Sequence, residues 1–76
     1  MKKLITDSEK EIHISEVNET NIIIAKINGI PHSCIYHTKK LGWCSFTEGG
    51  RTDNWCSLRE MLNESMFCNC EFFVVE

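Results

Sequence analysis

No apolar run in this chain of 76 residues is longer than four residues. A membrane-spanning helix needs about 20 consecutive apolar residues, so the sequence excludes a helical membrane protein. Basic residues are also few, with eight Lys and Arg against eleven Asp and Glu and a net charge of −3, which excludes nucleic-acid binding by overall positive charge. The length predicts one small domain over residues 1–76 and excludes a multidomain enzyme.

The sequence lacks a Cys-x-x-Cys motif, although it contains the five cysteines Cys34, Cys44, Cys56, Cys68 and Cys70. Structural zinc sites usually use two close-spaced ligand pairs, and an odd number of cysteines does not suit a disulfide framework. Asp7 interrupts the N-terminal segment before a signal-peptide apolar region forms, so we expect a cytoplasmic protein with reduced thiols. We predict that the cysteines lie in the core and that the protein binds no metal and no cofactor.

The alternative to core thiols is a small zinc- or thiol-based regulatory module built on His32, Cys34 and His37. In a strand, His32 and Cys34 share one face while His37 points to the other, so the three side chains do not converge without a bulge. Cys–His catalysis also requires a concave pocket with supporting residues, which a 76-residue monomer rarely supplies. We therefore predict that the protein is not an enzyme and has no catalytic residue.

The sequence favours strands over helices, with nine Ile and a single Ala. Residues 11–17 alternate polar and apolar side chains, which predicts a strand, and the β-branched run at 22–27 predicts a central strand. Asn28-Gly29 predicts a type I′ hairpin that leads into a strand at 30–37. Pro31 cannot donate a backbone hydrogen bond, so we expect the start of that strand at an edge or just outside the pairing.

Residues 43–47 predict a fourth strand, and residues 48–54 predict a mobile loop. Ser57 and Glu60 form a capping-box pattern that predicts a helix of about two turns, ending near 65–67 and followed by a last strand at 71–76. The predicted fold is α+β, a mostly antiparallel sheet of about five strands with one short helix on one face, in the order β-β-β-β-α-β. One short helix leaves the other face bare, so we expect a homodimer or higher homo-oligomer.

Three segments of the C-terminal half form a pattern of an aromatic strand, a serine-capped helix and a terminal apolar strand. They are Gly42-Trp43-Cys44-Ser45-Phe46, Trp55-Cys56-Ser57-Leu58-Arg59-Glu60-Met61-Leu62 and Glu71-Phe72-Phe73-Val74-Val75-Glu76. This pattern resembles small orphan proteins of phages that infect low-GC bacteria. The resemblance implies a protein of the host-cell cytoplasm that inhibits a host defence system. It implies no catalytic or ligand residue.

We expect a non-enzymatic interaction protein that binds a host defence effector. The acidic C-terminal half suggests that carboxylates occupy a basic groove of that effector, and the candidates are Glu48, Asp53, Glu60 and Glu64. The alternative is an oligomeric sponge for a signalling nucleotide, which stacking and charge would hold through Arg51, Trp43, Trp55 and Tyr36. Direct nucleic-acid binding is not expected, because Lys39 and Lys40 are too few cations beside the aromatic residues.

Overall fold

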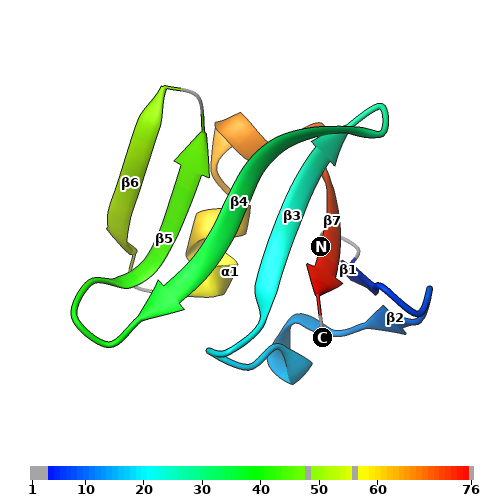
Figure 1. Cartoon of the computed structure of the whole chain (residues 1–76), viewed down its shortest axis with the longest axis horizontal. Helices are drawn as coiled ribbons and strands as arrows, with labels where there is room; N and C mark the ends of the chain where they lie inside the picture. The colour runs from blue at the N-terminus through cyan, green and yellow to red at the C-terminus, as the bar shows by residue number, and fades with distance from the viewer. Residues whose placement is uncertain (1–3, 48, 56, 76) are drawn as a thin grey trace.

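The computed structural model describes residues 4–47, 49–55 and 57–75, which form one mixed sheet with short helical segments (Figure 1). The elements are β1 (Leu4–Thr6), β2 (Glu11–Ile12), η1 (Ile14–Glu16, 3-10), β3 (Ile22–Ile27), β4 (Ile30–Thr38), β5 (Gly42–Thr47), β6 (Gly50–Trp55), α1 (Leu58–Leu62), η2 (Ser65–Phe67, 3-10) and β7 (Glu71–Val75). The strands lie in the order β2-β1-β7-β3-β4-β5-β6. Neighbouring strands are antiparallel except β1 and β7, which pair in parallel.

The α+β class is confirmed, but the mostly antiparallel sheet is larger than the expected five strands, and it is mixed. The described sheet has seven strands and one parallel pair. Strand β1, which the sequence pattern does not predict, places Leu4 opposite Phe72 and so pairs the first described strand with the last. A three-residue strand has too short a pattern to recognise, and its pairing partner lies almost the whole chain away.

The strand predicted at residues 11–17 is also wrong, because within this range only Glu11–Ile12 forms a strand. The chain then turns into η1, where the His13 ring nitrogen Nδ1 accepts a hydrogen bond from the backbone N–H of Ser15 at 3.1 Å. Ile14 and Val17 both pack against the core, and their spacing of three residues suits a helical turn. Alternating polar and apolar residues over such a short segment are therefore compatible both with a strand and with a short strand followed by a helical turn.

Residues 48–54, predicted as a mobile loop, contain most of strand β6, so that prediction is wrong from Gly50 onward. Gly50 has a φ of +124° and pairs with Thr47, so the chain reverses within a tight hairpin. The Thr47 hydroxyl accepts from the Gly49 N–H at 3.1 Å and donates to the Gly50 carbonyl oxygen at 3.4 Å. Because β6 is an edge strand that pairs on one side only, its polar sequence is compatible with the sheet.

The hairpin between β3 and β4 follows the prediction. Asn28 and Gly29 have φ angles of +52° and +80°, the left-handed conformations that a type I′ turn requires. Strand β3 pairs with β4 on one side and β7 on the other, which confirms its central position. Pro31 lies opposite Lys26, next to an irregularity in the register, where a missing backbone donor interrupts no regular ladder.

The helix prediction is confirmed at its start. The Ser57 side chain accepts from the backbone N–H of Glu60 at 3.1 Å, and α1 follows directly. The α-helix ends at Leu62, earlier than predicted, and η2 continues the helical segment to Phe67. Cys56, the residue before this cap, lies outside the described residues.

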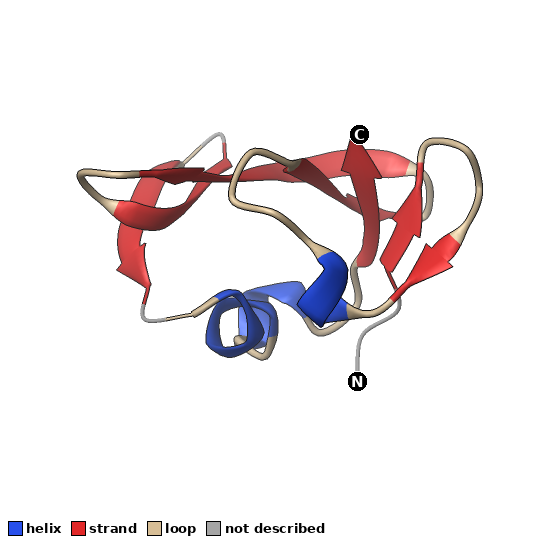
Figure 2. Ribbon diagram, turned by 90° about the horizontal axis from the view of Figure 1, so that it is seen from below, coloured by secondary structure: helices blue, strands red, loops and turns tan. Residues whose placement is uncertain are grey.

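The core lies between the sheet and the helical segments, which are all on one side of it (Figure 2). Side chains alternate between the two faces of a strand, so every second residue of the central strands points toward the helices. The core residues are Leu4, Ile23, Ala25, Ile35, Trp43, Leu58, Met61, Leu62, Phe67, Cys70, Phe72 and Val74. Buried Thr6, Ser33 and Ser45 lie on the same side, because they pair in register with Val74, Ala25 and Ile35.

Candidate interaction surface

The face of the sheet away from the helical segments carries a group of apolar side chains that we call the open face. The register aligns one row of it across the sheet, since Phe73 lies opposite both Ile5 and Ile24, and Cys34 lies opposite both Ile24 and Phe46. Beside this row, Ile22 lies opposite Val75, and Tyr36 follows Cys34 by two residues on the same face of β4. The open face consists of Ile5, Ile22, Ile24, Cys34, Tyr36, Phe46, Phe73 and Val75.

No helical segment among the described residues covers the open face (Figure 2). Phe46 is 55% exposed, and Ile22 and Val75 are also exposed, whereas Ile23 and Val74 on the other face are fully buried. Scattered exposed apolar residues are ordinary, but these three share one face of one sheet with five partly buried apolar neighbours. Such a contiguous apolar surface is suited to contact with another molecule.

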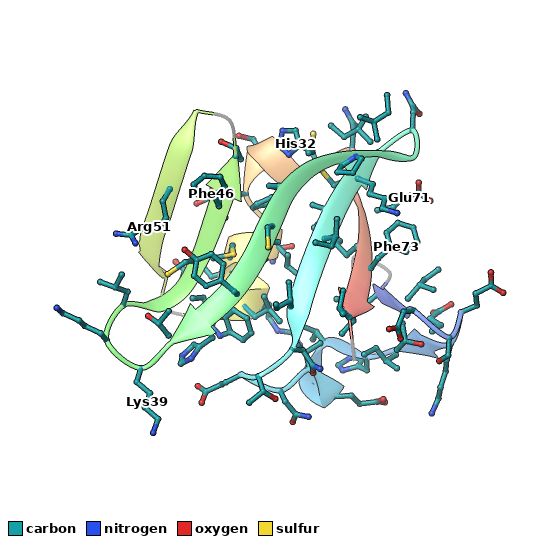
Figure 3. All side chains as sticks on the ribbon, in the orientation of Figure 1. His32, Lys39, Phe46, Arg51, Glu71 and Phe73 are labelled. Carbon is teal, nitrogen blue, oxygen red and sulfur yellow. The ribbon has the colours of Figure 1, made fainter. Side chains whose placement is uncertain are left out.

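Charged residues border the open face on two sides (Figure 3). The Lys26 ammonium lies 4.5 Å from the centre of the Phe73 ring, close enough for a cation–π contact. Lys26 also pairs in register with Glu71, while exposed Arg51 lies opposite Phe46 on β6. An apolar centre with a charged border is the usual composition of a protein–protein contact.

The four acidic residues expected to bind a partner do not form one described cluster. Glu60 is exposed on α1, and Glu64 is half-buried at the start of η2, so both belong to the helical side of the molecule. The backbone of Asp53 lies in β6, and Glu48 is outside the described residues. The open face therefore gathers residues from more strands than the predicted acidic set does.

The residues expected to frame a nucleotide are divided between the two faces. Tyr36 belongs to the open face, and Arg51 lies at its border. Trp43 is 9% exposed on the helical side, where its ring meets the His37 ring edge to face at 5.1 Å. The backbone of Trp55 pairs with Trp43 in the β5–β6 register. Within one chain, Tyr36 and Trp43 cannot contact the same ligand from opposite faces of the sheet.

The residues of the possible zinc site are also dispersed. The His32 ring lies 6.4 Å from the Phe67 ring of η2, whereas Cys34 is part of the open face. The prediction that His32 and Cys34 share a face is wrong because the β3–β4 register shifts between Ala25 and Lys26. Among the His, Cys, Asp and Glu side chains that the structure describes, no three come close enough to hold a metal ion.

The cysteines differ in exposure. Cys44 and Cys70 are buried, Cys34 is half-buried and Cys68 is exposed, while Cys56 lies outside the described residues. Desolvation by burial raises the pKa of the Cys34 thiol, which keeps it protonated at neutral pH. A nucleophilic cysteine needs the opposite shift, toward the thiolate.

A sheet with one helix needs bulky side chains to fill its core, which predicts mostly core positions for the aromatic residues Trp43, Phe46, Trp55, Phe72 and Phe73. For Phe46 this prediction is wrong, because its side chain is exposed. Trp43 and Phe46 are three positions apart on one strand, so they point to opposite faces. Trp43 is buried and Phe46 is exposed. The two-residue alternation of side chains along a strand could have predicted this difference. It requires only the boundaries of β5 and one residue of that strand that is known to be buried.

Comparison with known proteins adds no relative, because no protein-family model, no curated protein and no solved structure matches this chain significantly. Within the described part of the chain, no helix has the length and apolar character needed to cross a membrane.

Proposed function

We propose that this chain is a non-enzymatic interaction protein that binds another protein through the open face. The observation that supports this proposal is the exposure of Phe46, Ile22 and Val75 on one sheet face with no described helix over it. Burying apolar surface stabilises a complex by about 25 cal/mol per Å² before the costs of association are subtracted. An exposed phenylalanine beside an arginine is suited to a central contact, because aromatic and Arg side chains are enriched in interface hot spots.

The partner that we propose is a host defence effector, as the resemblance to small phage proteins implies. Its binding surface would be apolar at the centre, with an acidic group placed to meet Arg51. This assignment moves the contact from Glu60 and Glu64, which lie on the helical side, to the opposite face of the sheet. Glu60 and Glu64 then supply solubility and steering of the encounter rather than buried contacts.

A matched pair of variants tests this function. Phe46→Asp places a charge on the open face, while Ile30→Asp changes a side chain that is 69% exposed at the β3–β4 turn, opposite Ile27 and outside the open face. The chain and its variants are expressed in a bacterium with an active defence system, and the plating of a sensitive phage is measured. We expect the unchanged chain and Ile30→Asp to restore plating, and Phe46→Asp to lose most of this effect.

Two results would contradict the proposal in different ways. Full activity of Phe46→Asp would exclude the open face as the binding surface. Failure of the unchanged chain across hosts with different defence systems would exclude the defence effector as partner. A sedimentation experiment on the same three proteins identifies a second copy as the occupant instead, if the unchanged chain is a dimer and Phe46→Asp is a monomer.

A further inference from the structure

A second surface feature lies apart from the open face. It is a depression of about 330 Å³ between the β1–β2 hairpin, η1 and the C-terminal part of β7. Thr6, Lys10 and Ile12 line it from the hairpin, Glu16 from η1 and Val74 from β7. None of these residues belongs to the open face. Its volume is near the lower end of the range of about 300–1,000 Å³ that small-molecule sites occupy.

The depression brings two opposite charges to one small volume. Lys10 and Glu16 both line it, and both residues are exposed. Among the described residues, neither side chain has an ion-pair partner, so the two charged groups are more than 4.0 Å apart. Both charges therefore remain available to a molecule in the depression that carries the two opposite charges.

Local hydrogen bonds fix the walls before any ligand binds. The Thr6 hydroxyl accepts from the Lys10 backbone N–H at 3.1 Å, which holds the turn between β1 and β2. The Asn21 side chain accepts from the Asn18 N–H at 2.8 Å and donates to the Val75 carbonyl oxygen at 3.4 Å, which ties the turn before β3 to β7. A preformed site loses less conformational freedom on binding than a mobile one.

We propose that this depression binds a small zwitterion, namely a free α-amino acid with a short aliphatic side chain. The Lys10 ammonium meets the carboxylate of the ligand, and the Glu16 carboxylate meets its ammonium group. Of the two apolar lining residues, half-buried Ile12 contacts the aliphatic side chain, whereas Val74 is only 1% exposed and closes the depression from the core side. Charge-assisted hydrogen bonds at both ends set the orientation, because each is about twice as strong as a neutral one.

The probe is L-valine, titrated into isotope-labelled protein while backbone amide signals are followed by NMR. We expect saturable shifts at Lys10, Glu16 and Asn18 with a dissociation constant in the millimolar range, about −4 kcal/mol. N-acetyl-L-valine lacks the ammonium charge and L-valinamide lacks the carboxylate charge. Each analogue should bind about tenfold more weakly than valine, because it loses one charge-assisted contact.

Substitutions separate the two contacts. Lys10→Met should abolish the preference for valine over valinamide, and Glu16→Gln should abolish the preference for valine over N-acetylvaline. Lys39→Met and Glu60→Gln change exposed charges outside the depression and should preserve both preferences. The absence of saturable shifts up to about 50 mM valine, or equal binding of all three compounds, would overturn the proposal. Phe46→Asp should leave valine binding unchanged, so this result is independent of the function proposed for the open face.

Discussion

Ile22 and Val75 face each other across the β3–β7 pair and are 43% and 42% exposed. The next pair along the same two strands, Ile23 and Val74, is 0% and 1% exposed. One step in the register therefore separates the interior of the protein from its open face. Four β-branched residues of similar size and propensity occupy these positions, so their different exposure comes from the layer of helical segments on one side only.

This contrast predicts opposite effects of the same substitution at neighbouring positions. Ile23→Thr places a hydroxyl and a smaller side chain in the core and should reduce the free energy of unfolding by about 2–4 kcal/mol. Ile22→Thr keeps a β-branched residue on an exposed position and should change it by less than about 0.5 kcal/mol. Urea denaturation followed by tryptophan fluorescence measures both values. Equal losses would show that the open face is covered in solution.

The two hairpin glycines give a second matched comparison. Gly29 has a φ of +80°, and an added methyl group would contact no atom within 4 Å, so Gly29→Ala tests backbone strain alone. We expect it to lower the free energy of unfolding by about 1 kcal/mol. In Gly49→Ala the methyl group would make an ordinary contact of 3.6 Å with the Thr47 hydroxyl. Thermal unfolding should therefore show a smaller loss for Gly49→Ala, and the reverse order would exclude strain at Gly29 as the cause.

Features set by local chemistry were predictable from the sequence. Asn28 and Gly29 require the same left-handed backbone in any context that contains their hairpin. Ser57 caps α1 because its hydroxyl reaches a backbone N–H three residues later. The central position of β3 followed from apolar residues on both of its faces, although that pattern also exposes Ile22 to solvent.

Features set by distant pairing were not predictable. Strand β1 exists because Leu4 meets Phe72, and nothing within the first six residues specifies that partner. The depression between Lys10 and Glu16 depends on the same arrangement, since it needs β7 beside the β1–β2 hairpin. Side-chain size alone favours a core position for Phe46, whereas the strand face on which it lies leaves it exposed. The open face can be recognised only when the pairing register of the strands is known.

The Ser57 cap predicts a measurable loss on truncation. Ser57→Ala removes the hydroxyl that accepts from the Glu60 N–H, and it should lower the free energy of unfolding by about 1 kcal/mol. Ser57→Thr retains the acceptor and should recover most of this loss. Ser65→Ala removes an exposed serine that has no side-chain hydrogen bond among the described residues, so it serves as the control. If Ser65→Ala costs as much as Ser57→Ala, capping does not explain the effect.

Cys34 predicts how stability changes at alkaline pH. Burial raises the pKa of its thiol, so the folded protein keeps this proton at a pH where the unfolded chain, with a pKa of about 8.5, has lost it. The stability that comes from this difference is complete below the unfolded pKa and is lost as the pH rises through the folded pKa. The free energy of unfolding should therefore fall with increasing pH above about 8.5, and Cys34→Ser should reduce this slope. Exposed Cys68 should also react with iodoacetamide faster than Cys34, because alkylation requires the thiolate and access to it. An unchanged slope in Cys34→Ser together with equal alkylation rates would contradict the raised pKa, since both measurements depend on the same retained proton.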